Sequence, residues 1–328
     1  MSLSRPASAA GNSVHDDPDP DRPAAAYEPP LLHPVRQIGE RTLDFRRQVA
    51  LMAIINRTPD SFYDAGRTFA LDAAVSAAMQ AVHDGADWVD IGGVPFAPGP
   101  ALAAAEEAAR VIPVIQAVRA SSDVIISADT FLPSVAEAAI AAGATVINDT
   151  TGLSNPDLAR VAADAGVHLV ITHSLAVPRT AYPRPQYADV VAEVTEFLQR
   201  RAEYAQELGV SPEKIIVDPG HDLNKNTLHS LELTRRLSEI AALGYPVLAA
   251  VSNKDFVGET LDAAKADRVE GSLAAGVVSI MNGARILRMH NVPAARSAIR
   301  MTEAILGWRA PAYLRHNMGE FNEPAVRA

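Results

Sequence analysis

The chain has 328 residues, of which 48% are hydrophobic and 21% charged, and it contains no cysteine. The lack of cysteine excludes disulfides, thiolate metal sites and cysteine nucleophiles. A formal net charge of −10 argues against non-specific binding to nucleic acid or to anionic membranes, so we expect neither as a partner. No apolar stretch approaches the roughly 20 residues of a membrane span, and we expect a cytoplasmic protein.

Both ends of the chain are predicted to lie outside the folded domain. The first thirty residues carry four aspartates and several prolines but no apolar segment. Residues 1–40 are therefore predicted to form a disordered or loosely packed tail. Residues 41–310 are predicted to form one domain, and residues 311–328 a C-terminal tail.

Apolar runs of strand type alternate with alanine-rich stretches of helical periodicity between about residues 50 and 308. The predicted strands are 51–55, 87–91, 124–128, 144–147, 167–171, 214–217, 246–250 and 284–289. The clearest predicted helices are 70–84, 101–119, 131–142, 187–208, 226–242, 260–282 and 292–307, and glycines 85, 143, 166, 209, 244 and 283 are predicted to end helices. Eight alternations predict a parallel sheet covered by helices. They favour a closed (β/α)₈ TIM barrel, an α/β fold, over an open doubly wound sheet.

The first predicted strand runs directly into the polar loop Asn56-Arg57-Thr58-Pro59-Asp60-Ser61-Phe62. Strand ends of this kind carry the chemistry of many α/β enzymes. The same loop could simply cap the next helix, because Thr, Asp and Ser are common N-cap residues. The segment taken alone favours neither interpretation.

Polar residues also follow each of the other predicted strands. In chain order these ends are Asp90-Ile91-Gly92-Gly93, Ser127-Ala128-Asp129-Thr130, Ile147-Asn148-Asp149, Thr172-His173-Ser174, Asp218-Pro219-Gly220-His221-Asp222, Ser252-Asn253-Lys254 and Arg288-Met289-His290-Asn291. A single Asp here is usually a helix cap, and a single His usually packs. Polar ends on all eight strands predict a deep polar pocket for a heteroaromatic or phosphorylated ligand. Arg288 and His290 lie two residues apart, point the same way and suit a phosphate.

These strand ends, in this order and spacing, resemble dihydropteroate synthase, the pterin-binding barrel of folate synthesis. The resemblance spans residues 45–308, and its motifs are Asn56-x-Thr58-Pro59-Asp60-Ser61-Phe62, Asp90-Ile-Gly-Gly, Asp129-Thr130, Ile147-Asn148-Asp149, Asp218-Pro219-Gly220, Ser252-x-Lys254 and Arg288-x-His290. Members of the family bind a hydroxymethyl-dihydropterin diphosphate, expel diphosphate and join the exocyclic carbon to the amine of p-aminobenzoate. The resemblance implies a homodimer and a transferase reaction.

The resemblance also implies roles for individual residues. The pterin would be bound by Asp129, Asn148, Asp218 and Lys254. The diphosphate would be bound by Asn56, Arg288 and His290, with Asn56 also contacting a Mg²⁺ ion that accompanies it; Asp129, Lys254 and Arg57 are the candidate catalytic residues. The chemistry is reasonable, because a carboxylate such as Asp218 accepts two parallel hydrogen bonds from the guanidinium-like pterin edge. Asp129 would stabilise positive charge on the exocyclic carbon.

The sequence departs from the family where the second substrate would bind. After the second strand, Glu-Ser-Thr-Arg-Pro-Gly is replaced by residues 94–99, Val-Pro-Phe-Ala-Pro-Gly. After the sixth strand, Ile-Gly-Phe-Gly-Lys is replaced by residues 221–225, His-Asp-Leu-Asn-Lys, and an arginine is replaced by Asn253. The pattern resembles the divergent second synthase copy of actinobacteria, which is regarded as inactive in folate synthesis. Arg57 is a candidate to replace the arginine missing at Ala97.

Four functions remain open at this stage. The chain is a pterin-binding protein with weak or no condensing activity, an active dihydropteroate synthase, or a related transferase with another nucleophile or pterin. A metal-dependent hydrolase using His173, Asp218, His221 and Asp222 is a remote fourth, because no His pair has the spacing of metal ligands.

Overall fold

The computed structural model describes residues 26–56, 66–96, 98–181 and 184–317 of the chain. The described residues do not include Arg57, the Thr58–Phe62 loop or Ala97. The predictions made on these residues remain predictions. Most of the two predicted tails lies outside the described residues as well. Among the described helices, none combines the length and apolar character needed to cross a bilayer.

Parallel strands form a closed barrel in the order β10-β3-β4-β5-β6-β7-β8-β9. The strands are β3 (Ala50–Asn56), β4 (Trp88–Gly92), β5 (Ile125–Asp129), β6 (Val146–Asp149), β7 (His168–Thr172), β8 (Ile215–Asp218), β9 (Val247–Ala249) and β10 (Ala284–Met289). Each coincides with a predicted strand to within one or two residues at either end. The predicted TIM barrel is confirmed.

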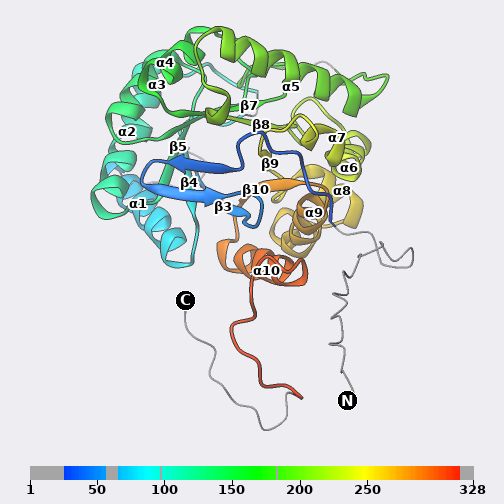
Figure 1. Cartoon of the computed structure of the whole chain (residues 1–328). Coiled ribbons are helices and arrows are strands. Elements are labelled where there is room, and N and C mark those ends of the chain that lie inside the picture. The colour runs from blue at the N-terminus through cyan, green and yellow to red at the C-terminus, as the bar shows by residue number, and fades with distance from the viewer. Residues whose placement is uncertain (1–25, 57–65, 97, 182–183, 318–328) are drawn as a thin grey trace, which may run out of the picture.

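Helices surround the barrel, as Figure 1 shows. They are α1 (Gly66–His83), α2 (Ala104–Ser121), α3 (Pro133–Ala141), α4 (Asp157–Ala165), α5 (Val190–Glu207), α6 (Thr227–Arg235), α7 (Leu237–Ala241), α8 (Asp255–Leu261), α9 (Val269–Met281) and α10 (Val292–Ile305), with 3₁₀ turns at Pro212–Lys214 and Lys265–Asp267. The predicted helix-ending glycines at 85, 143, 166, 209, 244 and 283 all have positive φ. Alanines and branched apolar residues fill the layer between helices and strands.

Two predicted helices differ from the structure. The predicted helix 226–242 is divided at Arg236, whose φ of −106° and ψ of 24° interrupt the helix. The predicted helix 260–282 is really two elements, because Asp262 adopts a left-handed conformation that ends α8 and α9 begins only at Val269. In both cases one residue leaves the helical region without a glycine or proline to signal it.

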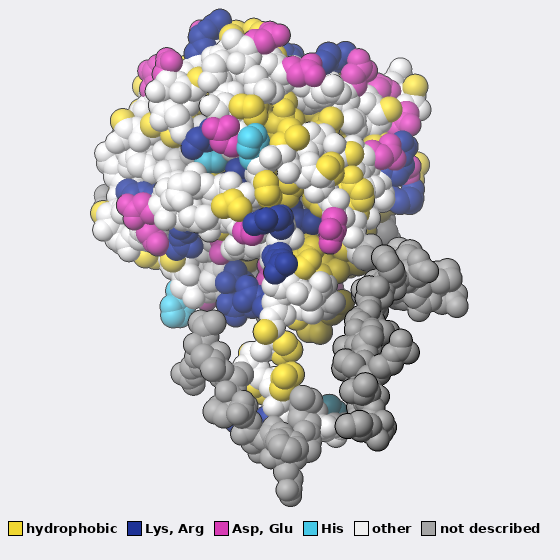
Figure 2. Space-filling view, viewed as in Figure 1, with side chains coloured by type: hydrophobic (Ala, Val, Ile, Leu, Met, Phe, Trp, Pro, Cys, Tyr) yellow, Lys and Arg dark blue, Asp and Glu magenta, His cyan; other side chains and the backbone are white. Residues whose placement is uncertain are grey.

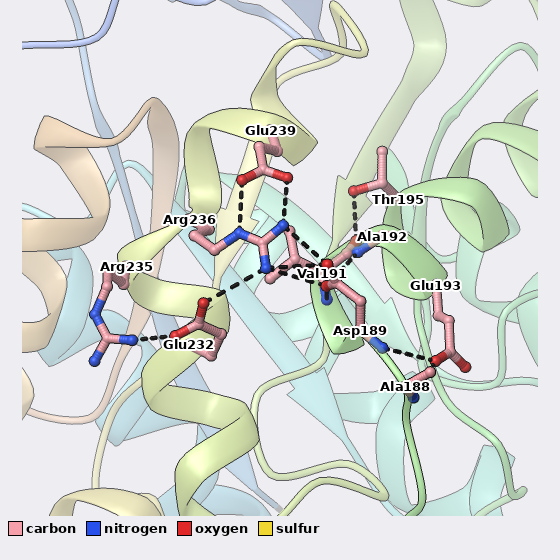
Figure 3. A network of polar contacts seen from close by, with 10 residues as sticks. All are labelled: Ala188, Asp189, Val191, Ala192, Glu193, Thr195, Glu232, Arg235, Arg236 and Glu239. Atoms are coloured by element: carbon pink, nitrogen blue, oxygen red, sulfur yellow. Dashed lines mark hydrogen bonds and ion pairs between the residues drawn. The ribbon is translucent and has the colours of Figure 1, made fainter.

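Arg236, at the break between α6 and α7, joins three helices (Figure 3). Its Nε lies 2.6 Å from Glu239, and its Nη1 lies 3.1 Å from Asp189, the N-cap of α5. Glu232 of α6 completes the group. The side chains are partly exposed, so each ion pair contributes little to stability. Together they fix the start of α5, where the loop from β7 ends.

An antiparallel hairpin of β1 (Val35–Ile38) and β2 (Arg41–Asp44) precedes the barrel. Ile38, Leu43 and Phe45 are buried with Met52, Trp88, Ile125 and Ile286 in the inner core of the barrel. The hairpin, dark blue in Figure 1, crosses the end of the barrel where the strands begin. Residues 35–40 of the predicted tail therefore lie in a strand and its turn, and the opposite end of the barrel is left for a ligand.

Charged side chains of both signs are interspersed over the face shown in Figure 2. Such mixing of both signs is typical of a solvated surface.

Candidate functional site

A cavity of about 350 Å³ opens at the carboxyl ends of the barrel strands. Its lining includes every predicted site residue that the structure describes, namely Asn56, Asp129, Asn148, Asp218, Lys254, Arg288 and His290. These residues come from β3, β5, β6, β8, β10 and the loops after β9 and β10. The predicted polar pocket is therefore present. The parallel barrel brings residues as far apart in the sequence as Asn56 and His290 to a single face.

Asp90 is the centre of the polar network beneath this cavity. Its carboxylate is fully buried on β4 and accepts a 2.5 Å hydrogen bond from Ser127 Oγ, which in turn accepts one from Trp88 Nε1 at 2.8 Å. Arg288 Nε donates to Asp90 Oδ2 at 2.7 Å, and Asn148 Nδ2 donates to the same oxygen at 3.1 Å. Asp90 thus orients two side chains that face the cavity.

The amide of Asn148 has a defined orientation because its nitrogen is held by Asp90. Its oxygen, Oδ1, is buried and has no hydrogen-bond partner among the residues that the structure describes. A buried acceptor without a partner costs roughly 1–3 kcal/mol. A ligand that brings a donor into the cavity would recover this energy.

Asp129 lies beside Arg288, with 3.2 Å between Oδ2 and Nη2. Burial, reinforced by repulsion from Asp90, nevertheless raises the pKa of Asp129 to about 7, and Arg288 only partly opposes this. One arginine therefore faces two carboxylates. In its ionised form Asp129 would stabilise a cationic or electron-poor group beside it.

Asp218 forms the deep wall of the cavity at the end of β8. Its Oδ1 accepts a 2.7 Å hydrogen bond from the backbone N–H of Gly220, and burial raises the pKa of its carboxyl group. Gly220 has a φ of 68°, and a Cβ at this position would lie 2.1 Å from the carbonyl oxygen of His173. Glycine is therefore required for the turn that holds the carboxylate.

Two other predicted side chains, those of Lys254 and His290, have their pKa values lowered by burial. Burial lowers the pKa of Lys254, and it lowers that of His290 to about 4, with Arg288 and Lys265 adding to the effect on the histidine. His290 is thus neutral near pH 7, and its Nδ1 lies 2.9 Å from Ser252 Oγ. A neutral imidazole offers a phosphate one hydrogen bond rather than a charge.

Several of the departures from the family line the cavity, among them Phe96, Leu223 and Asn253. The loop after β4 pairs with the loop after β7 through the backbone: Arg179 N donates to Phe96 O, and Gly99 N donates to Arg179 O, both at 3.2 Å. These two loops are therefore joined beside the cavity.

The side chains considered for a metal-dependent hydrolase do not converge. Nδ1 of His173 lies 2.8 Å from Nζ of Lys225, and Nε2 of His221 lies 3.1 Å from Oγ1 of Thr234. Asp222 points to the start of α8. Within the described ranges, no group of three or more His, Asp or Glu side chains could hold a metal ion.

Three charged residues of the site were not among the predicted ones. Asp90 appears in the sequence analysis only as part of the motif Asp90-Ile-Gly-Gly. Its position inside an otherwise apolar strand is the signal that could have marked it as a site residue. Glu107, in the first turn of α2, is buried against the cavity, and burial raises its pKa. Lys265, in the turn after α8, reaches the rim. No sequence signal marks Glu107 or Lys265, because each lies outside a strand end.

Residues 52–290, which include the barrel strands and the whole set of cavity side chains from Asn56 to His290, match the model of the family described as pterin binding enzyme. The chain belongs to the pterin-binding enzyme family. The present chain is 44% identical over 267 residues to a protein of Mycobacterium leprae named inactive dihydropteroate synthase 2. The match covers 80% of this chain and 92% of that one. It is 37% identical over 257 residues to the dihydropteroate synthase of Escherichia coli K12, covering 78% and 91%.

Solved structures agree with this assignment. The dihydropteroate synthase of Xanthomonas albilineans with 4-aminobenzoic acid superposes with a TM-score of 0.78 at 38% identity, covering 83% of this chain and 98% of that one. The same enzyme in complex with 7,8-dihydropteroate gives 0.75 at 37% identity, with the same coverage. The predicted resemblance to dihydropteroate synthase, including the divergent second copy, is confirmed.

Proposed function

We propose that this chain binds a reduced pterin or its diphosphate at the carboxyl end of the barrel and condenses it with p-aminobenzoate weakly or not at all. The observation that carries the proposal is that Asp218 and Asn148 line the same cavity. One oxygen of the carboxylate is held by a backbone N–H, and the buried amide oxygen of Asn148 has no hydrogen-bond partner among the described residues. A pterin edge supplies the donors that this pair would accept.

The other cavity groups fit the rest of such a ligand. The ammonium group of Lys254 would donate to ring acceptors. Asp129 would face positive charge that develops on the exocyclic carbon as diphosphate leaves. No covalent bond to the protein is needed, because positioning and charge stabilisation suffice for the departure of diphosphate.

Diphosphate would be bound by Arg288, His290 and Asn56 at the cavity mouth. Mg²⁺ fits this arrangement only as an ion brought by the diphosphate, because the described residues hold no carboxylate cluster for it. Asn56 offers a single hard oxygen, as suits an ion that keeps waters and substrate phosphates as its main ligands. Mg²⁺ would screen the charge of the leaving group.

The weakness of condensation is inferred from two replaced residues that line the cavity. Phe96 takes the place of the family's threonine, and Asn253 that of an arginine. Losing one charged contact to diphosphate or carboxylate costs about 1.5–3 kcal/mol, which corresponds to roughly one to two decades in rate. The Mycobacterium relatives are named inactive, which supports the same conclusion.

A second candidate is an active dihydropteroate synthase. The E. coli relative carries that name, and all of the described pterin and diphosphate residues line one cavity here. Arg57 would then replace the missing charge at Ala97. A transferase that joins the pterin to another nucleophile is the remaining variant of this idea.

Calorimetry with a dihydropterin and with its diphosphate tests the proposal. Binding by the wild type, abolished in Asp218→Ala, is expected, and no binding by the wild type would refute every pterin function. Diphosphate release with and without p-aminobenzoate then decides between the candidates. Fast release that depends on p-aminobenzoate would show an active synthase.

We also propose that the protein is a homodimer, assembled through the face formed by α6, α8 and α9. A groove of about 410 Å³ there is lined by apolar residues including Leu231, Phe256, Leu261, Ala274 and Val278. Leu261 and Val278 are large exposed hydrophobics, as expected of an interaction surface. The cytoplasmic location is part of the same proposal.

A further inference from the structure

The loop from β8 to α6 contains two left-handed residues that are not glycine. Asp222 has a φ of 64° and Asn224 a φ of 53°. The dihydropteroate synthases that the sequence resembles carry glycine at these two positions. Asp and Asn enter this conformation more readily than other side chains, so the backbone path can be kept while two polar side chains are added.

Asn224 connects this loop to the loop that follows β7. Its Oδ1 accepts hydrogen bonds from Leu175 N at 2.8 Å and from Ser174 Oγ at 3.1 Å. Its backbone oxygen accepts a further bond from Tyr187 at 3.0 Å. One side of the β8–α6 loop is therefore fixed to its neighbour.

Asp222 connects the other side of the loop to the start of α8. Its Oδ2 accepts hydrogen bonds from the backbone N–H groups of Asp255 at 2.5 Å and Phe256 at 3.4 Å, while its Oδ1 accepts one from Ser230 Oγ at 3.0 Å. The first N–H groups of a helix have no partner within the helix. Lys254, the N-cap residue of α8, provides no side-chain cap, so Asp222 supplies one from another loop.

His221 strengthens the same junction. Its ring stacks on that of Phe256 with a centroid distance of 5.9 Å and an interplanar angle of 28°, and it is fully buried. The start of α8 is thus held by the ring of His221 and by the carboxylate of Asp222, which are consecutive residues.

The charge of Asp222 also acts on the ammonium group of Lys254. Burial lowers the pKa of this lysine, and Asp222 is the strongest of the carboxylates that oppose the shift. Asp218 and Asp255 also oppose it, whereas Arg288 adds to the lowering. These four charged groups come from the β8 end, the loop after it, the start of α8 and β10.

We propose that Asp222 is a positioning residue of the candidate site: by capping α8 from the loop after β8, it holds the start of that helix, and with it the backbone of Lys254, beside the cavity. The identity of the ligand rests on the proposed function, whereas the capping of α8 by Asp222 does not. The substitution of a family glycine by Asp222 thereby adds a connection between the loop after β8 and α8 in this chain.

Three variants test this proposal. Asp222→Gly keeps the left-handed backbone and removes the carboxylate, and Asp222→Asn keeps a hydrogen-bond acceptor but removes the charge. Asp262→Gly is the matched control, because Asp262 is also left-handed and lies at the opposite end of α8. Dihydropterin affinity is measured by calorimetry as a function of pH. The titration of Lys254 is measured separately from its pH-dependent acetylation by mass spectrometry.

Dihydropterin affinity should fall about tenfold in Asp222→Gly, as expected when a charge-assisted hydrogen bond is lost, and stay within twofold in the control. In Asp222→Asn, the loss of binding at high pH and the titration of Lys254 should both move to lower pH. Unchanged affinity and titration in both Asp222 variants, or an equal loss in Asp262→Gly, would overturn the proposal. If the wild type binds no pterin but the titration moves, the proposed function fails and the role of Asp222 is supported.

Discussion

Replacing Asp90 with asparagine would show how much of the site depends on one buried charge. The two oxygens of Asp90 accept hydrogen bonds from Ser127, Arg288 and Asn148. An amide has one oxygen, so at least one of these buried donors would face an NH₂ group. An unpaired buried donor costs about 1–3 kcal/mol, and a broken buried ion pair costs about 3–5 kcal/mol.

Asp129 still faces Arg288 in this variant. The loss of unfolding free energy should therefore lie near the lower end of the range for a broken buried ion pair, at about 3 kcal/mol. Urea denaturation followed by far-UV circular dichroism measures this loss of unfolding free energy. In thermal unfolding, the midpoint temperature should fall by roughly 6–12 °C. The matched control is Asp157→Asn, which removes an exposed ion pair with Arg160 and should cost less than about 1 kcal/mol. Equal losses in the two variants would refute the reasoning.

The same substitution should change the pH dependence of stability. In the folded wild type Asp129 keeps its proton up to about pH 7, whereas in the unfolded chain it loses it near pH 4. The folded state therefore binds more protons in this window, and stability falls as pH rises from about 4 to about 7. Without Asp90 the pKa of Asp129 should be lower, so the fall should be smaller and end at a lower pH. An identical pH profile would contradict the assigned repulsion.

Three other predictions follow from the site and the surface. Phe96→Thr combined with Ala97→Arg should raise p-aminobenzoate-dependent diphosphate release by about one to two decades; an unchanged rate would place the defect in the loop after β8. Burial lowers the pKa of Lys225 to about 7. Unfolding should therefore take up a proton between about pH 7 and 10.5, and stability should rise with pH in that window. Lys225→Met should remove this rise, as measured by urea denaturation. Val278→Glu should convert the proposed dimer to a monomer in light scattering, and a dimer of unchanged affinity would exclude the α9 face.

The barrel could be predicted from the sequence because its strands are apolar throughout and its helices end at glycines. The hairpin of β1 and β2 could not. Its strands are short and carry charged residues, and Arg36 is buried because the carbonyl oxygens of His33, Glu213 and Ile215 accept its hydrogen bonds. The break at Arg236 depends on contacts with α5, which local periodicity does not report.

The sequence predicts which residues line the candidate site, but it does not predict the hydrogen bonds that connect them. Residues at strand ends of a parallel barrel must share one face, which is enough to bring Asn148 and Asp218 together. The central role of Asp90 depends on the register of β4 and β5, which places it directly across from Ser127. Such a pairing joins positions far apart in the sequence, and no local pattern encodes it.

The hairpin at the base of the barrel also has a kinetic consequence. Because it fills one end of the barrel core, a ligand reaches Asp218 from the other end. If the proposed function is right, the pterin would have to enter this one opening before any second ligand that joins it in the cavity. Binding would then follow a compulsory order with the pterin first.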